Sequence, residues 1–167
     1  PQSINPTKGQ GLLWRGMNLP ALRQPVTASP EAYEPAVAWS TWSSWSALAA
    51  HWTAAFDAAA VLDTEQASVM RESINSAMSD HQKLAAAADY LNEMTRAVHY
   101  DDGFWTFAPR PGSRTLATAY GHNLDRAVLG TALLEAVGLE SHPVLIGNGV
   151  AWVAPDIPRL RGLEKVV

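Results

Sequence analysis

Apolar residues recur at helical spacing in the middle of the chain and predict three consecutive helices. These helices are expected at residues 45–62, 64–78 and 81–98. Each begins near a polar residue whose side chain can accept a hydrogen bond from the free backbone N–H groups of the first turn. We expect Ser43 or Ser44 to cap the first helix, Thr64 the second and Asp80 the third.

A fourth helical pattern covers residues 124–137 and is largely apolar. Gly138 follows it, in the position where a left-handed residue commonly ends a helix. The apolar stretch 143–146 has the composition of a buried strand, and we expect a second strand at 163–167. We therefore predict an α+β domain whose fourth helix is buried at the centre, packed against these strands and surrounded by the three N-terminal helices.

The first forty residues follow a different pattern. Residues 1–10 are polar and predict a disordered lead, residues 11–17 predict one strand, and the proline-rich stretch 20–35 predicts an extended linker. We interpret residues 1–40 as a tail, a strand and a linker from a missing N-terminal β domain. Residues 41–167 would then be the core, truncated at its C-terminus.

Composition narrows the possible functions. The chain has 167 residues, enough for one domain with a core, and a formal net charge of −4, which disfavours nucleic acid or an anionic membrane as partner. Its apolar runs are too short for a membrane span. It contains no cysteine, so no thiolate can act on it. The absence of cysteine fits an exported or periplasmic bacterial protein. The lack of an initiating Met and of a signal peptide indicates a mature, processed or cut chain.

A short loop opens the fourth helix, and residues 120–126 read Tyr-Gly-His-Asn-Leu-Asp-Arg. This loop resembles the nucleophile loop of the transglutaminase-like, papain-related enzymes, which reads Tyr-Gly-Asp-Cys-Lys-Asp-Lys. Asn123 stands in the place of the cysteine. A Pro109-Arg110-Pro111 turn and Leu116 precede the loop at the spacing of that family.

The N-terminal side is similar to a bacterial two-part family, in which a β-rich domain of unknown function precedes a transglutaminase-like core. The similar stretches are Asn18-Leu19-Pro20-Ala21-Leu22 and Ser40-Thr41-Trp42-Ser43-Ser44-Trp45. The resemblance runs from about Trp14 to the end of the chain. It implies a partial transglutaminase-like or papain-like fold, consisting of the helix-rich half and a small antiparallel sheet.

The resemblance also implies what Asn123 has replaced. At a helix N-terminus, free N–H groups and the positive dipole end favour a cysteine thiolate and stabilise an oxyanion. The amide nitrogen of Asn is not nucleophilic because its lone pair is delocalised, whereas Asn is a favoured N-cap. We therefore expect Asn123 to cap the helix without reacting.

The family's histidine has no counterpart. The stretch 155–160 (Pro-Asp-Ile-Pro-Arg-Leu) aligns Lys165 with its place, and a protonated ammonium group cannot act as a general base. A competing alignment uses the stretch 150–153, which also lacks the histidine. The third triad position would lie beyond Val167. On the first alignment, Asn123 and the Lys165 backbone should face each other across a cleft.

These features imply a pseudoenzyme, a non-catalytic transglutaminase-like domain that binds a peptide or protein partner in the former active-site cleft. The residues expected to bind are Tyr120, His122, Asn123, Trp105 and Trp152. No cofactor is expected, and no metal, since the histidines lack paired spacing. Two alternatives remain open: a structural or assembly module of an exported protein, and a hydrolase or acyltransferase with Ser141 or Thr118 as nucleophile.

Overall fold

The computed structural model describes residues 2–4, 11–13, 40–74, 78–99, 108–147, 158 and 163–166. The helices are α1 (Trp45–Ala59), α2 (Thr64–Glu72), α3 (Asp80–Met94), α4 (Gly112–Thr118) and α5 (Asn123–Ala136). The strands are β1 (Gln2–Ile4), β2 (Gly11–Leu13), β3 (Arg96–Ala97), β4 (Tyr120–Gly121), β5 (Leu145–Gly147) and β6 (Leu163–Val166). This content agrees with the predicted α+β class.

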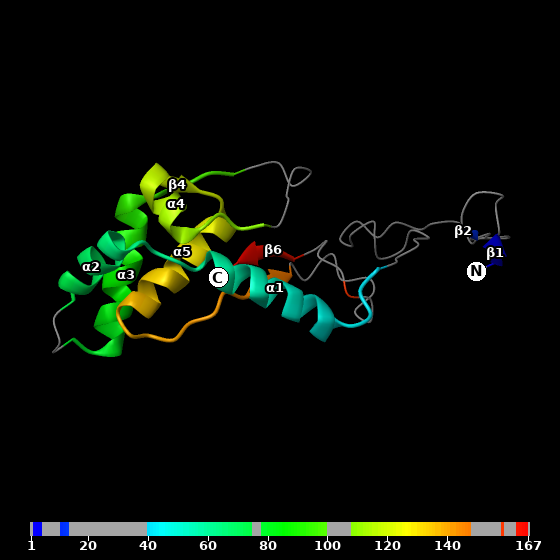
Figure 1. The fold of residues 1–167 in the computed structure, drawn as a ribbon, viewed down its shortest axis with the longest axis horizontal. Helices are drawn as coiled ribbons and strands as arrows, with labels where there is room; N and C mark the ends of the chain where they lie inside the picture. Colours follow the sequence, from blue (N-terminus) through cyan, green and yellow to red (C-terminus); the bar gives the residue numbers. More distant parts are fainter. Residues whose placement is uncertain are drawn as a thin grey trace, which may run out of the picture.

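Helix α5 lies in the middle of the helical core, with the other helices around it (Figure 1). One apolar cluster joins it to α1 and contains Leu48, Trp52, Phe56, Ala59, Leu124 and Val128. A second cluster joins it to α2, α3 and α4 and contains Met70, Ala87, Leu116, Leu129, Leu133 and Val137. Because Val128, Leu129 and Leu133 are fully buried, the prediction of a buried central helix is confirmed.

Side-chain caps fix the starts of α1, α2 and α3. Ser44 caps α1 as predicted, since its Oγ accepts from the Ala47 N–H at 3.1 Å. The other two predicted caps are wrong by one residue: Asp63 caps α2 and Ser79 caps α3. In both cases a Gln three residues after the cap bonds back to the backbone of the cap. This reciprocal capping box outweighs the intrinsic preference of the next polar residue.

Helices α2 and α3 end earlier than their apolar patterns predict, at Glu72 and Met94. After α3 the chain becomes extended at Thr95, whose hydroxyl donates to the Leu91 carbonyl. Helix α5 ends at Ala136 with Val137 as its C-cap, and Gly138 follows as the predicted left-handed residue, with φ +81°. The Leu139 N–H donates to the Leu134 carbonyl and the Gly138 N–H to that of Glu135, which together make a Schellman motif.

The described strands form three separate pairs. Strands β1 and β2 are antiparallel, and so are β5 and β6, in which Ile146 lies opposite Lys165. Strands β3 and β4 are parallel, because α4 and the chain before it cross over between them. The expectation of a single small antiparallel sheet was therefore wrong. The prediction of a disordered lead was also wrong at Gln2–Ile4, which is strand β1.

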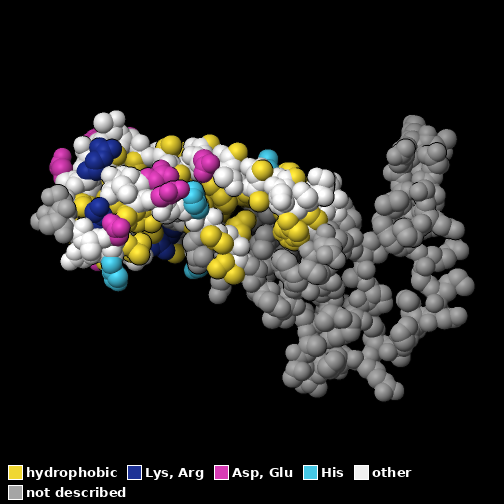
Figure 2. Space-filling view, turned by 90° about the horizontal axis from the view of Figure 1, so that it is seen from below, with side chains coloured by type: hydrophobic (Ala, Val, Ile, Leu, Met, Phe, Trp, Pro, Cys, Tyr) yellow, Lys and Arg dark blue, Asp and Glu magenta, His cyan; other side chains and the backbone are white. Residues whose placement is uncertain are grey.

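In Figure 2 the acidic and basic side chains on the described part of the face are interspersed rather than gathered by sign. None of the helices within the described ranges has the length and apolarity that a membrane span needs.

Two glycines differ in how much space surrounds them. A Cβ at Gly121, where β4 meets α5, would lie 2.8 Å from Thr115 Cγ2 and 3.0 Å from Asp125 Cβ. A Cβ at Gly130, in the middle of α5, would meet only Leu91 Cδ2 at 3.7 Å, an ordinary contact. Packing thus requires a glycine at position 121 and tolerates a side chain at position 130.

We predict opposite effects when these two glycines are replaced by alanine. Gly121→Ala should lower the free energy of unfolding by ~1–3 kcal/mol because of overpacking. Gly130→Ala should raise it by ~0.5–1 kcal/mol, since Ala is favoured over Gly inside a helix. Urea denaturation of the two variants beside the wild type measures both effects. A Gly121→Ala variant as stable as the wild type would contradict the packing described at β4.

Candidate functional site

The loop that resembles a nucleophile loop enters α5 through a cap formed by His122. The His122 Nδ1 accepts from the Leu124 N–H at 3.4 Å, and the His122 N–H donates to Asp125 Oδ2 at 3.1 Å. Asn123 is already helical and is the first residue of α5. The prediction that Asn123 caps the helix was therefore wrong by one residue, and its side chain lies free of that role.

The carboxylate of Asp125 holds the loop in place. It is 7% exposed and accepts from the Arg110 backbone N–H at 2.9 Å and from the Arg110 Nε at 3.1 Å, besides the bond from His122. A buried ion pair is tolerated when hydrogen bonds satisfy its remaining atoms, as they do here. Asp125 therefore ties the segment before α4 to the first turn of α5.

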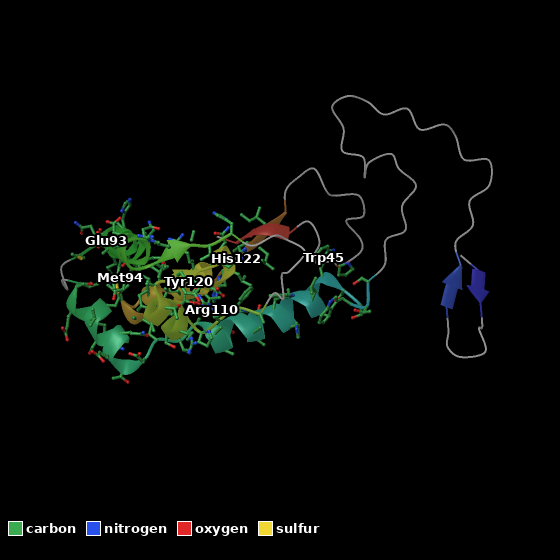
Figure 3. All side chains as sticks on the ribbon, turned by 90° about the horizontal axis from the view of Figure 1, so that it is seen from above. Trp45, Glu93, Met94, Arg110, Tyr120 and His122 are labelled. Carbon is green, nitrogen blue, oxygen red and sulfur yellow. The ribbon has the colours of Figure 1, made fainter. Side chains whose placement is uncertain are left out.

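Arg110 also organises the residue that begins the loop. Its Nη2 donates to the Tyr120 carbonyl, and its guanidinium carbon lies 4.8 Å from the centroid of the Tyr120 ring, a cation–π contact. Figure 3 shows Arg110 and Tyr120 side by side near His122. The Tyr120 side chain is held by this stacking, and the residue keeps 43% of its surface exposed.

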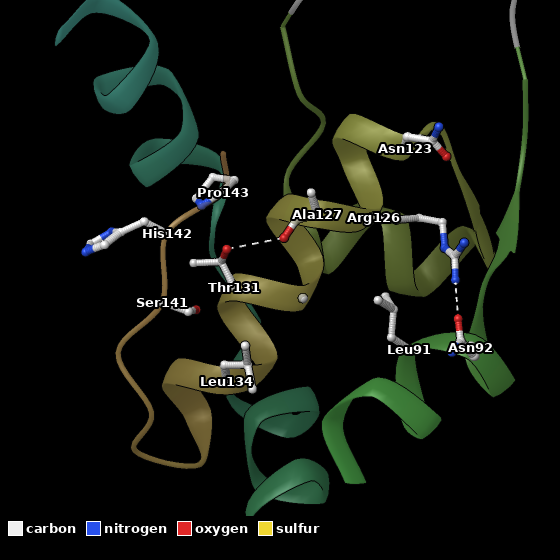
Figure 4. A pocket seen from close by; sticks show the side chains of 11 residues that line it. Leu91, Asn92, Asn123, Arg126, Ala127, Thr131, Leu134, Ser141, His142 and Pro143 are labelled. Carbon is white, nitrogen blue, oxygen red and sulfur yellow. Dashed lines mark hydrogen bonds between the residues drawn. The ribbon is translucent and has the colours of Figure 1, made fainter. Parts of the chain in front are cut away.

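Asn123 lines an open cavity of about 380 Å³, which we call the α5 pocket. Its floor is one stripe of α5, its first wall is α3, and its second wall is the segment before β5 (Figure 4). The lining residues are Leu91, Asn92, Asn123, Arg126, Ala127, Gly130, Thr131, Leu134, Ser141, His142 and Pro143. Polar groups at the start of α5 and apolar groups along its middle give the pocket two chemically different parts.

The two alternative nucleophiles lack an activating partner among the described residues. The Ser141 Oγ is buried without a hydrogen-bond partner, and the neighbouring His142 side chain is 72% exposed and points away from it (Figure 4). The Thr118 hydroxyl donates to the backbone of α4 and accepts from Arg110. Neither hydroxyl is in contact with a general base, so the geometry favours no serine or threonine mechanism.

The structure brings together only some of the predicted site residues. Tyr120, His122 and Asn123 are adjacent at the start of α5, whereas Trp105 and Trp152 lie outside the described residues. Lys165 lies on β6, a strand in contact with α5, and its backbone position is described without its side chain. The facing of Asn123 and Lys165 across a cleft stays a prediction. The part of the chain that the structure describes contains no cluster of three or more acidic or histidine side chains suited to a metal.

Sequence reasoning missed two arginines of this region. In the sequence, Arg110 stands out only as the middle of a Pro-x-Pro turn and Arg126 only as the last residue of the 120–126 loop. Their roles depend on contacts 15 and 34 residues away in sequence, to Asp125 and Asn92 respectively. No sequence spacing signals either contact, because both partners lie on other segments of the chain.

The comparisons with known proteins bear on the fold. No protein-family model matches the chain, and a search of curated proteins finds no match. Among solved structures, the fold is similar to that of a "putative protease" from Parabacteroides distasonis ATCC 8503, with a TM-score of 0.59 and 17% sequence identity. The match covers 75% of this chain and 24% of that one, so this chain spans about a quarter of its structural neighbour. The likeness is one of fold alone, and membership of the transglutaminase-like family stays a prediction.

We predict that Asp125→Ala loosens the start of α5. The loss leaves Arg110 and the His122 N–H without their acceptor, which should lower the free energy of unfolding by ~1–3 kcal/mol. The matched control is Asp89→Ala, which removes an exposed carboxylate from α3. Urea denaturation of both variants measures the difference, and equal stabilities would show that the Asp125 contacts contribute nothing.

Proposed function

We propose that this chain is a non-catalytic, transglutaminase-like domain that binds a peptide segment in the α5 pocket. The observation that carries the proposal is the place of Asn123: it begins the buried helix α5, where the resembling enzymes have their cysteine, and it lines the pocket. A helix start beside a cavity is where such enzymes hold an acyl group. With Asn in that place, the pocket keeps its position and loses its nucleophile.

The lining of the pocket supports a peptide as the occupant. Leu91, Ala127 and Leu134 offer apolar surface, while Asn92 and Asn123 offer amide groups that can both donate and accept. Binding sites commonly combine an apolar surface with a few placed polar groups, and the volume of about 380 Å³ lies toward the small end of their usual range. A short stretch of extended peptide fits these properties.

The first prediction from this proposal is the absence of thiol-type chemistry. The purified chain should show no amine incorporation and no peptide hydrolysis above a buffer blank. Asn123→Cys should not restore either activity, because Lys165 is aligned with the place of the family's histidine, and such an acid–base partner contributes ~100–10,000-fold. Activity of the native chain that disappears in Asn123→Ala would overturn the proposal.

The second prediction uses position 123 as a reporter of binding. The chain has no cysteine, so Asn123→Cys carries a single thiol, placed at the pocket. Iodoacetamide should label it, and an excess of a mixed peptide pool should slow that labelling. The control is Ala85→Cys on the exposed face of α3, whose labelling should be unchanged by the pool.

The outcome is read by mass spectrometry of the labelled protein over time. Protection confined to position 123 supports peptide binding in the pocket. If the peptide pool left the labelling rate of both variants unchanged, the α5 pocket would not be the peptide-binding site.

A further inference from the structure

Arg126 is the one lysine or arginine among the described residues that line the α5 pocket, and no carboxylate lines it. It is half-buried, its Nε donates to Thr95 Oγ1 at 3.2 Å, and its Nη2 donates to Asn92 Oδ1 at 2.7 Å. Both acceptors are neutral. Within the described ranges no carboxylate lies at ion-pair distance from Arg126, whereas Arg110 is paired with Asp125 at 3.1 Å.

The guanidinium of Arg126 is therefore held in one orientation, and no carboxylate of the described residues neutralises its charge. The two bonds hold the planar guanidinium in one orientation, so little further ordering is needed when an anion binds. The N-terminus of α5, one turn away, adds a positive potential. A carboxylate can accept two parallel hydrogen bonds from a guanidinium, which makes the pair both strong and specific in geometry.

The shape of the pocket indicates which carboxylate. The bond between Arg126 and Asn92 spans from α5 to α3 and so crosses the space between the two helices (Figure 4). A peptide lying along α5 in this pocket would have to end at the hydrogen bond between Arg126 and Asn92, because that bond blocks its path. Beside this bond, Leu91, Ala127 and Gly130 form an apolar surface suited to the last side chain of that peptide.

Gly130 supports the same conclusion from a different direction. Packing allows a side chain at this position, and a glycine inside a helix is unfavourable. Because Gly130 has no side chain, the space next to Leu91 in the pocket stays open. A glycine that destabilises the helix and only keeps a space open is expected where a ligand occupies that space.

We propose that the α5 pocket binds the C-terminal carboxylate of a peptide, with Arg126 as the anchor for that carboxylate. This inference rests on the proposed function and adds the chemical group that is recognised.

The test uses the full chain and an array of N-terminally tethered hexapeptides in which the last two residues take all combinations. Each peptide is present twice, once as the free acid and once as the C-terminal amide. The wild type should bind the free acids ~10–100-fold more tightly than the corresponding amides, because amidation replaces a charge-assisted pair with a neutral contact.

Four variants assign the preference to the pocket. Arg126→Gln should bring the ratio of acid to amide binding to about one, and Arg126→Lys should keep part of it, since the charge remains without the fork. Arg114→Gln, which removes an exposed charge from α4, should leave the ratio unchanged. Gly130→Leu should abolish binding of both forms by filling the floor.

Each remaining outcome has a defined meaning. Equal binding of acids and amides by the wild type, lost in Gly130→Leu, would overturn the carboxylate inference and leave the proposed function standing. No binding of any peptide would overturn both. A preference for acids that Arg126→Gln leaves intact would overturn the assignment to Arg126. The wild-type comparison needs no variant, so it holds even if Arg126→Gln fails to fold.

Discussion

The geometry of the candidate site depends on the buried carboxylate of Asp125. It accepts hydrogen bonds from the backbone and side chain of Arg110 and from the backbone of His122. These donors belong to two segments, the approach to α4 and the loop before α5. The same arginine stacks on Tyr120, so a single carboxylate determines where the loop begins and how α5 starts. The orientation of Asn123 toward the pocket follows from that start, because a helical first residue projects its side chain along a defined face.

Local patterns predicted the parts of the fold that depend on nearby residues. The period of apolar residues located α5, and Gly138 was recognised as its end because few other residues adopt a positive φ there. Capping was harder, since Asp63 competes with Thr64, Ser79 with Asp80 and His122 with Asn123. In each case the reciprocal bond from the residue three positions on selects the earlier member of the pair.

The walls of the pocket could not be predicted in the same way. Leu91 and Asn92 come from α3, Asn123 and Arg126 from α5, and Ser141 from the segment before β5. No sequence spacing brings three such segments together; the packing of α3 on α5 does. The parallel pairing of β3 with β4 was missed for the same reason, because it joins residues on either side of α4. Trp105 and Trp152 were singled out by residue type alone, and they fall outside the described residues.

The position of α5 between the two apolar clusters has a consequence for how the molecule comes apart. Leu124 and Val128 belong to the cluster with α1, whereas Leu129 and Leu133 belong to the cluster with α2, α3 and α4. The two clusters are therefore joined through consecutive turns of one helix. If either cluster lost its packing, one face of α5 would be exposed to water even while its other face stayed packed. The described core should accordingly behave as one cooperative unit, whose slowest amide hydrogen exchange is found in the middle of α5.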